Sequence, residues 1–263
     1  MNVAIIGGGV MGEAILAAAL ERSVFEASRV CVCEVVEARR AQLRSVYGVS
    51  VSGDPGATMA DADLVILSVK PQDMKSVRGA LKADALLLSI MAGVRIESIQ
   101  REFSHDRVVR VMPNTPVAAK AGMSVWTATA GVLAEQRELA RNLLAAIGRE
   151  IYVEEEKKLD MATAVSGSGP AYVFLFIEAM VEGAVAVGLT RGQAEELVLQ
   201  TVYGSAVYAQ AAGRPASELR ARVTSPAGTT AAALHELEKG GFRASIGEAI
   251  RAAHRRAIEL GNG

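Results

Sequence analysis

The sequence has few aromatic residues and few of the side chains that bind metals. Phenylalanine, tyrosine and tryptophan make up 4% of its 263 residues, so alanine, valine, leucine and isoleucine must build the core. The two cysteines, Cys31 and Cys33, and the three histidines show no metal-ligand spacing. We therefore expect no metal site and interpret both cysteines as small core residues.

The chain also lacks an excess of charge of one sign. It carries 28 basic and 29 acidic residues without a basic run, so we expect no nucleic-acid partner. The N-terminal apolar run is interrupted by glycine after six residues and has no basic flank. It therefore does not resemble a signal peptide, and a cytoplasmic location is expected. The remaining composition, 51% hydrophobic and 22% charged, is typical of a folded soluble protein.

The first functional motif lies at the N-terminus. Residues 1–6 predict a short buried strand, residues 13–20 predict a helix, and between them stands the G-x-G-x-x-G sequence Gly7-Gly8-Gly9-Val10-Met11-Gly12. This order is that of a dinucleotide-binding fold, and it favours cofactor binding over an ordinary glycine-rich turn. The three motif glycines would allow a tight turn, a close approach of the pyrophosphate and close packing of the helix, at Gly7, Gly9 and Gly12 in that order. The amides at the helix start would face the phosphates.

The second predicted strand, residues 29–34, ends in Glu34, which lies 22 residues after Gly12. An acidic residue at about this distance accepts hydrogen bonds from the ribose hydroxyls. It would also repel a 2′-phosphate, so Glu34 favours NADH over NADPH. Arg39 and Arg40 could instead pair with a 2′-phosphate, but we prefer to interpret them as the solvated face of a helix over residues 36–46.

Strands and helices continue to alternate up to residue 153. Strands are predicted at residues 49–51, 64–69, 85–90, 107–112, 122–127 and 150–153. The run 64–69 is apolar almost throughout, as a parallel strand buried on both faces should be. Residues 54–60 are expected to form a polar turn, and residues 136–147 a helix.

Ligands of open α/β sheets bind at the carboxyl ends of the strands. Lys70 follows such a strand, so we expect it to face a cofactor or substrate rather than solvent, with Pro71 opening the next helix. Gly93 follows the next strand. Asn114 stands in a loop whose prolines predict a rigid, non-helical segment, and its amide would suit a carboxamide.

The character of the sequence changes at the charged stretch 154–158, where we expect a domain boundary. Residues 172–187 are apolar enough to suggest a membrane span, but Glu178 and Glu182 and the short length argue against one. We expect this helix in a dimer core, followed by helices at 191–210, 217–222, 229–238 and 242–260. Glycine- and serine-rich stretches precede two of the helices, at residues 166–170 and 224–230.

The second of these stretches leaves two interpretations open. Thr229 or Thr230 could simply cap the following helix. Alternatively, the free amides at the helix start could bind a small carboxylate.

Several motifs together resemble the pyrroline-5-carboxylate reductase family: GGGVMG (7–12), SVKP (68–71), MPNTP (112–116), SGSGPAYVF (166–174) and VTSPAGTTAAALHELE (223–238). The last is the family's own signature. The resemblance implies an α/β, Rossmann-like dinucleotide-binding domain over residues 1–155. It implies an all-α dimerisation and substrate domain over residues 156–263, which forms a homodimer and often assembles further. The implied reaction is the reduction of 1-pyrroline-5-carboxylate to L-proline by NAD(P)H, the last step of proline biosynthesis.

The resemblance also implies roles for individual residues. The cofactor would be bound by Gly7, Gly9, Val10, Met11, Gly12, Ser68, Val69, Lys70, Pro71, Ala92, Gly93, Met112, Pro113 and Asn114, with Glu34 added by the argument above. The substrate would be bound by Pro170, Ser225, Pro226, Ala227, Gly228, Thr229 and Thr230. Many family members prefer NADPH and have a polar or basic residue after the second strand, so Glu34 departs from the family pattern.

Thr230 is the best candidate for a catalytic hydrogen-bond donor to the ring nitrogen, since no histidine, aspartate or lysine is obviously placed as an acid. Two alternatives remain. A β-hydroxyacid or other imine reductase would usually carry a lysine in its helical domain, and residues 172–187 contain none. A non-catalytic dinucleotide-binding protein would not need the intact loop 225–230.

Overall fold

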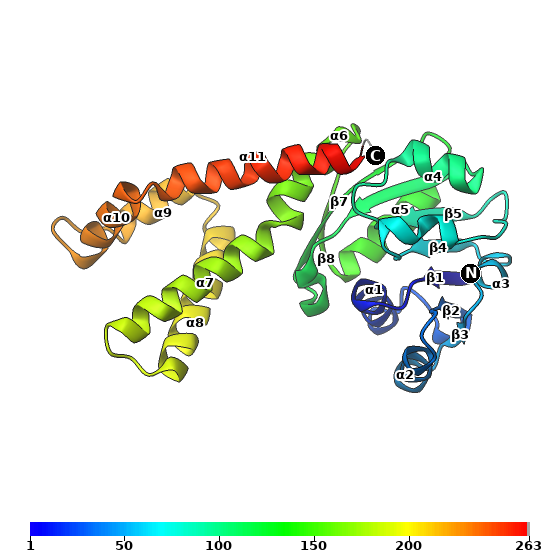
Figure 1. Cartoon of the computed structure of the whole chain (residues 1–263), viewed down its shortest axis with the longest axis horizontal. Helices are drawn as coiled ribbons and strands as arrows, with labels where there is room; N and C mark the ends of the chain where they lie inside the picture. Colours follow the sequence, from blue (N-terminus) through cyan, green and yellow to red (C-terminus); the bar gives the residue numbers. More distant parts are fainter. Residues whose placement is uncertain (262–263) are drawn as a thin grey trace. The chain divides into compact units, whose positions relative to one another are not determined.

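The computed structural model describes residues 1–261, and their contacts divide into two compact units (Figure 1). The first unit comprises residues 1–168 together with the chain from Ala252 onward, and the second comprises Gly169–Arg251. The first contains an α/β sheet and the second is helical. This confirms the expected fold class.

The first unit is built on an eight-stranded sheet with the order β3-β2-β1-β4-β5-β6-β7-β8 among the described residues. All neighbouring strands are parallel except β6 and β7, which are antiparallel. The central strands are buried at every position, as a sheet covered on both faces requires. The strands are β1 Val3–Ile6, β2 Val30–Cys33, β3 Ser50–Ser52, β4 Leu64–Leu67, β5 Leu86–Ser89, β6 Val108–Met112, β7 Gly122–Ala128 and β8 Gly148–Tyr152.

Two hydrophobic clusters cover the two faces of this sheet. One contains Ile5, Leu16 and Trp126, and the other contains Ile6 and Met59. Because neighbouring residues of β1 belong to different clusters, the strand contributes to both faces. The helices of this unit are α1 Val10–Glu21, α2 Glu37–Tyr47, α3 Pro55–Met59, α4 Ile96–Phe103, α5 Ala134–Ala146 and α6 Lys157–Ala162.

Two segments differ from their sequence-based predictions. The expected polar turn at 54–60 is the short helix α3, because Asp54 Oδ1 accepts hydrogen bonds from the amides of Gly56 and Ala57. The loop after β6, expected to be non-helical, forms a 3₁₀ helix over Thr115–Ala119. A proline in the first turn of a helix sacrifices no internal hydrogen bond, so Pro116 is compatible with it.

The division of contacts falls later than the boundary expected after residue 155. Helix α6 belongs to the first unit, and so does the π-helical turn Thr163–Gly167 that follows it. The chain then continues directly into the next helix, so the glycines and serines of residues 166–170 do not separate the two helices. The alternation of strands and helices ends at residue 153, but packing onto the sheet does not.

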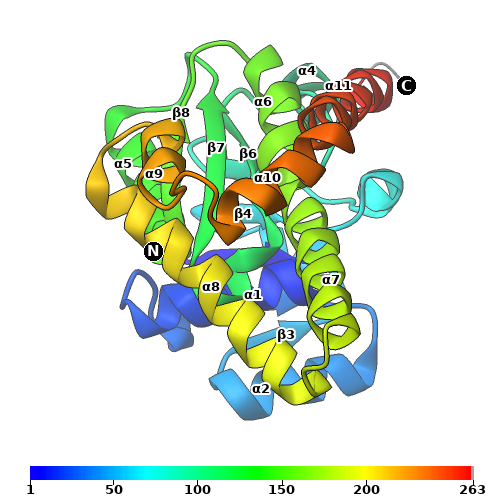
Figure 2. The same cartoon turned by 90° about the vertical axis from the view of Figure 1, so that its left-hand side faces the viewer.

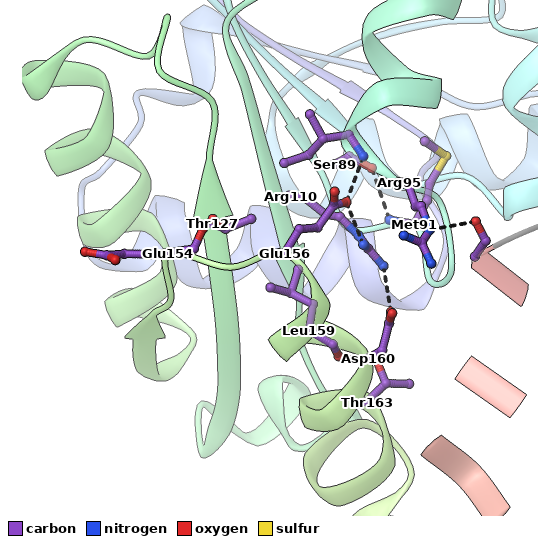
Figure 3. A network of polar contacts seen from close by, with 12 residues as sticks. Ser89, Met91, Arg95, Arg110, Thr127, Glu154, Glu156, Leu159, Asp160 and Thr163 are labelled. Atoms are coloured by element: carbon purple, nitrogen blue, oxygen red, sulfur yellow. Dashed lines mark hydrogen bonds and ion pairs between the residues drawn. The ribbon is translucent and has the colours of Figure 1, made fainter. Parts of the chain in front are cut away.

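Buried ion pairs explain why α6 belongs to the sheet (Figure 3). Arg110 in β6 is 3% exposed, and its guanidinium lies 2.7 Å from Glu156 Oε1 and 3.5 Å from Asp160 Oδ1. The same oxygen of Glu156 accepts a hydrogen bond of 2.8 Å from the amide of Ile96, the first residue of α4. A buried charge is tolerated when it is paired in this way, so these contacts join β6, α4 and α6.

The second unit is made of helices with a small buried interior. It contains α7 Gly169–Ala186, α8 Arg191–Ala212, α9 Ala216–Arg222, α10 Thr229–Lys239 and the first part of α11 Phe242–Gly261. Helices α7 and α8 converge towards the turn that joins them (Figure 2), and their cluster of buried residues consists of Val181, Ala194 and Val198. Large apolar side chains remain exposed on these two helices, among them Phe174, Leu175, Leu197 and Tyr203.

One helical stretch, Lys157–Ala186, is long and apolar enough to cross a membrane when judged by length and composition alone. Only 11% of its apolar window is buried within the chain. The same properties are expected of a helix that packs against another copy of the protein, because such a helix is apolar nearly all round.

Candidate active site

A cavity of about 680 Å³ lies at the carboxyl ends of β1, β2 and β4. This is the edge at which open α/β sheets bind ligands, and the volume is that of a small-molecule site. The cavity brings together six of the residues predicted to bind the cofactor, and Lys70 is among the most exposed of them. These six are Gly7, Gly9, Glu34, Ser68, Val69 and Lys70.

The glycine loop before the N-terminus of α1 has no room for a side chain at two of its positions. Gly7 turns the chain with a φ of +102°, and a Cβ there would lie 2.7 Å from the carbonyl oxygen of Ser68. A Cβ at Gly12 would lie 2.1 Å from the carbonyl oxygen of Gly7. By contrast, a Cβ at Gly9 would meet no atom within 4 Å. Gly9 therefore presents bare backbone to the cavity.

Val10 and Met11, the other two residues of the motif, have apolar side chains, so only their backbone amides can donate hydrogen bonds to a ligand. Val10, the first residue of α1, is 74% exposed, and Met11 packs against the hydrophobic core. No side chain caps the start of α1. The amides of its first turn are therefore available for an anion.

The donors around this loop fit a dinucleotide pyrophosphate. Ser68 Oγ is buried in the wall of the cavity and has no hydrogen-bond partner among the described residues. A buried hydroxyl without a partner is costly, and a phosphate oxygen beside it would remove this cost. The uncapped amides of α1 and the open backbone at Gly9 complete the same set of donors.

Glu34 is fixed by backbone hydrogen bonds at the end of β2. Its Oε2 accepts from the amide of Gly8 at 3.1 Å, and its Oε1 accepts from the amide of Val36 at 2.9 Å. The carboxylate thus lies beside the glycine loop, in the wall of the cavity.

Burial raises the pKa of the neighbouring Cys33 thiol, so this thiol stays protonated at neutral pH.

The two arginines after Glu34 are not the solvated face that the sequence suggested. Arg39 is half-buried, donates to the carbonyl oxygen of Gly8 at 2.9 Å and pairs with Glu13 at 2.5 Å. Arg40 donates to the carbonyl oxygens of Glu34 and Val35, at 2.7 and 2.9 Å. Both guanidinium groups therefore already hold parts of this loop region together.

The residues predicted to lie near the nicotinamide do not line this cavity. Ala92 and Gly93 follow β5, and Met112, Pro113 and Asn114 end or follow β6, farther along the same sheet edge. Asn114 is held at both ends of its amide. It donates to Ser166 Oγ at 3.2 Å and accepts from the amide of Met123 at 2.8 Å. Pro71 opens a 3₁₀ helix, Pro71–Ser76, behind Lys70.

The predicted substrate loop, residues 225–230, lies in the second unit. The amide of Gly228 donates to the carbonyl oxygen of Ser225 at 3.1 Å, and Ala227 has a φ of +57°. Helix α10 begins at Thr229, and its N-cap is Gly228 without any side-chain cap. The prediction that Thr229 or Thr230 is the cap is therefore wrong, since both already lie inside the helix.

Thr230 is half-buried, and within residues 1–261 its hydroxyl forms no hydrogen bond. The amides at the start of α10 are likewise not capped by a side chain. The loop thus offers amide donors and one hydroxyl to a small anionic ligand. Pro170, the other residue predicted to contact substrate, is the second residue of α7 and is half-buried in the same unit.

Sequence reasoning missed part of the cavity wall. Gly53 and Pro55 follow β3, and Asp73, Ser76 and Val77 lie in or beside the 3₁₀ helix after β4. The rule that pointed to Lys70, the position at a strand's carboxyl end, also applies to Gly53 and Pro55. The 3₁₀ helix has no comparable signal, because the sequence after Pro71 does not say which side chains turn towards the cavity.

Two known protein families match this chain, one in the part that contains the sheet and one in the helical part that follows it. The family described as NADP oxidoreductase, coenzyme F420-dependent, matches residues 2–93. The family described as pyrroline-5-carboxylate reductase dimerisation matches residues 156–260.

Relatives extend this match over almost the whole chain. The pyrroline-5-carboxylate reductase of a Synechocystis species is 42% identical over 264 residues, which covers 99% of this chain and 98% of the relative. The chain belongs to the pyrroline-5-carboxylate reductase family. A solved member from Coxiella burnetii has a TM-score of 0.91 at 35% identity, with 98% of both chains covered. The Plasmodium falciparum enzyme, solved with NADP bound, has a TM-score of 0.89 at 28% identity, with 99% and 98% covered.

The glycine loop yields a matched pair of variants. We expect Gly9→Ala to fold normally, within about 1 kcal/mol of the unaltered chain, because its backbone is extended and its Cβ meets open space. It should nevertheless weaken dinucleotide binding by about tenfold or more, equivalent to about 1.4 kcal/mol. Gly12→Ala should lower the free energy of unfolding by about 1–3 kcal/mol, because the loop must move away from the new Cβ.

Chemical denaturation followed by the fluorescence of Trp126, the only tryptophan in the chain, measures the stability of both variants. Titration with NADH measures their affinity. Unimpaired NADH binding by Gly9→Ala would show that the dinucleotide does not approach the loop at this position.

Proposed function

We propose that this protein reduces 1-pyrroline-5-carboxylate to L-proline with a nicotinamide dinucleotide, the last step of proline biosynthesis. The observation that carries the proposal is the near full-length match to enzymes of that name, in a chain that keeps both a dinucleotide loop and the substrate loop of the family. A reductase of another class would not need the sequence of residues 223–238, which is the family's own signature.

The reaction adds a hydride to the imine carbon and a proton to the ring nitrogen. The bound dinucleotide supplies the hydride. The glycine loop, Ser68 and Lys70 bind and orient the phosphates, and the ends of β5 and β6 receive the nicotinamide end of the cofactor. The residues at these two strand ends are Ala92, Gly93, Met112, Pro113 and Asn114.

The loop Ser225–Thr230 binds the substrate carboxylate through its amides and places the ring nitrogen near the Thr230 hydroxyl. Pro170 packs near the ring. A hydroxyl is a weak acid at neutral pH, so Thr230 acts by hydrogen-bonding the nitrogen while its charge changes. Most of the acceleration then comes from holding the imine carbon close to the hydride donor.

NADH is the preferred cofactor in this proposal. Glu34 stands where an acidic residue accepts hydrogen bonds from the ribose hydroxyls and repels a 2′-phosphate. Arg39 and Arg40, the cations that could pair with a 2′-phosphate, are engaged with Glu13 and with backbone carbonyls. NADPH binding would therefore require one of them to give up its present contacts.

The active form in this proposal is a homodimer that works in the cytoplasm and not in a membrane. The dimerisation family matches residues 156–260, which include the exposed apolar side chains of α7 and α8. Exposed apolar surfaces of this extent mark interaction sites, and a second copy of the same helices would cover them. We accordingly take residues 156–263 as the dimerisation and substrate domain, and residues 1–155 as the dinucleotide domain.

The first test follows nicotinamide absorbance with 1-pyrroline-5-carboxylate and equal concentrations of NADH or NADPH. We expect oxidation of both, faster with NADH, because of Glu34. Glu34→Gln should shift the preference towards NADPH by about tenfold, the effect of about 1.4 kcal/mol, because it removes the negative charge. Its single carbonyl oxygen can still accept from one of the two amides, that of Gly8 or that of Val36. Faster oxidation of NADPH by the unaltered chain would contradict the assigned role of Glu34.

Thr230→Ala should lower turnover by about ten- to a hundredfold, at the lower end of what a positioned proton donor contributes. Thr230→Ser keeps the hydroxyl and should retain most of the activity. Steady-state rates of both variants at saturating substrate measure the effect. Equal turnover by the alanine variant and the unaltered chain would remove Thr230 from the mechanism.

Leu175→Lys, on α7, should convert the dimer to a monomer, because Leu175 is 67% exposed and belongs to the apolar surface of that helix. Leu133→Lys is the matched control, since Leu133 is a 43% exposed leucine in the first unit. Sedimentation equilibrium distinguishes the two masses. A dimer that survives Leu175→Lys would contradict an interface on this face of α7.

A further inference from the structure

The loop that follows β5, residues 91–96, occupies a central place at the edge of the sheet. Strand β5 lies between β4, which leads to Ser68 and Lys70, and β6, which leads to Met112 and Asn114. The amide of Ile90 still donates to the carbonyl oxygen of Leu67 in β4, at 3.0 Å. The loop therefore begins between the two strand ends to which the proposed function assigns the cofactor.

Hydrogen bonds hold this loop at both ends and in the middle, and some of their partners lie in distant parts of the chain (Figure 3). The amide of Met91 donates to Ser89 Oγ at 3.3 Å. At the far end, the amide of Ile96 donates to Glu156 Oε1 at 2.8 Å. Between them, Arg95 Nε donates to the carbonyl oxygen of Gly261 at 2.8 Å.

The last turn of α11 also fits the loop by shape. Gly93 has a φ of +75°, and a Cβ at this position would lie 3.1 Å from Leu260 Cβ. Leu260 is 52% exposed, so it lies at the surface beside the loop and is not a core residue. Glycine at position 93 is thus required both by the backbone conformation and by the closeness of α11.

Glu156 and the Leu260–Gly261 turn, the two distant partners of this loop, lie at the two ends of the segment matched by the dimerisation family. Glu156 is the first residue matched by the dimerisation family, and Leu260 is the last. Glu156 is itself fixed by the buried guanidinium of Arg110. Helix α11 begins in the second unit and ends in the first. Both ends of the dimerisation segment therefore return to the same six-residue loop of the dinucleotide domain.

We propose that Glu156 and the Leu260–Gly261 turn form a clamp that holds residues 91–96 in the conformation that receives the nicotinamide end of the cofactor. Arg95 and Leu260 are positioning residues in this proposal, because they act through the backbone of the loop. The proposal rests on the proposed function for the identity of the ligand. It adds that the affinity for the cofactor depends on the end of the dimerisation segment as well as on the dinucleotide domain.

The test loosens the clamp at its exposed side. Leu260→Ala keeps the Cβ that lies nearest Gly93 and removes the rest of the side chain, which should loosen the last turn of α11 on the loop. Arg95→Met removes the donor to Gly261 but keeps an apolar stem. Arg95→Lys restores a donor and should recover part of the effect. Ile258→Ala is the matched control, since Ile258 is a 38% exposed residue of α11 two positions earlier, on a different side of the helix. Glu156 is left intact because its removal would leave the buried charge of Arg110 partly unpaired.

Two readouts are measured on each variant. Amide hydrogen exchange of the peptide covering residues 91–96 is followed without cofactor, and the dissociation constant for NADH is determined by titration. We expect Leu260→Ala and Arg95→Met to accelerate the exchange and to raise the NADH dissociation constant about fivefold, the usual effect of one lost hydrogen bond or contact. Arg95→Lys should fall between Arg95→Met and the unaltered chain, and Ile258→Ala should change neither quantity.

Unchanged exchange and unchanged NADH affinity in Leu260→Ala and Arg95→Met would overturn the clamp, and so would equal effects in Ile258→Ala. Failure of the proposed function has a different signature. An unaltered chain that binds NADH but does not reduce 1-pyrroline-5-carboxylate would refute that reaction, while the differences among these variants would still support the clamp. An unaltered chain that binds neither NADH nor NADPH would overturn the clamp as well.

Discussion

The turn from β1 into α1 leaves no space for a side chain at Gly7 or Gly12, because each would place a Cβ against the backbone of its neighbours. This close contact brings the start of α1 to the carboxyl ends of β1 and β4. It leaves the first amides of the helix uncapped, and it puts Ser68 Oγ beside them without a partner. Glu34, in the cavity wall, and Arg39 are tied to that loop by hydrogen bonds with Gly8. An anion-binding site is the physical consequence of this packing.

Most of the fold could be predicted because its elements carry strong local signals. The buried strands are short apolar runs, and α7, α8 and α11 are long and uninterrupted, so their existence and type were both predicted. The misses arose where one side chain decides the local structure. Asp54 converts an expected turn into α3 by capping it. In the same way, Arg110 packs α6 against the sheet, although the matched dimerisation family begins at residue 156. Neither effect is visible before the partners are known in space.

In the candidate site, too, some positions could be predicted from the sequence and others could not. Strand-end positions such as Glu34, Ser68 and Lys70 follow from the order of elements, and they lie together in one cavity. The partners of Arg39 and Arg40 could not be predicted, because helical periodicity cannot show that Glu13 and the carbonyls of residues 34 and 35 are within reach. The contact between Gly93 and Leu260 joins residues 167 positions apart in the chain, and no local pattern indicates it. The roles assigned by family resemblance remain predictions about a bound state.

Isotope transfer shows whether the protein moves a hydride from the cofactor to the imine carbon of the substrate. The unaltered protein is supplied with 1-pyrroline-5-carboxylate and NADH that carries deuterium at the transferred position of the nicotinamide ring. The product is then analysed by mass spectrometry and NMR. We predict L-proline with one deuterium on the former imine carbon, the ring carbon next to nitrogen that does not bear the carboxylate. Oxidation of NADH without labelled proline, or proline labelled elsewhere, would contradict it.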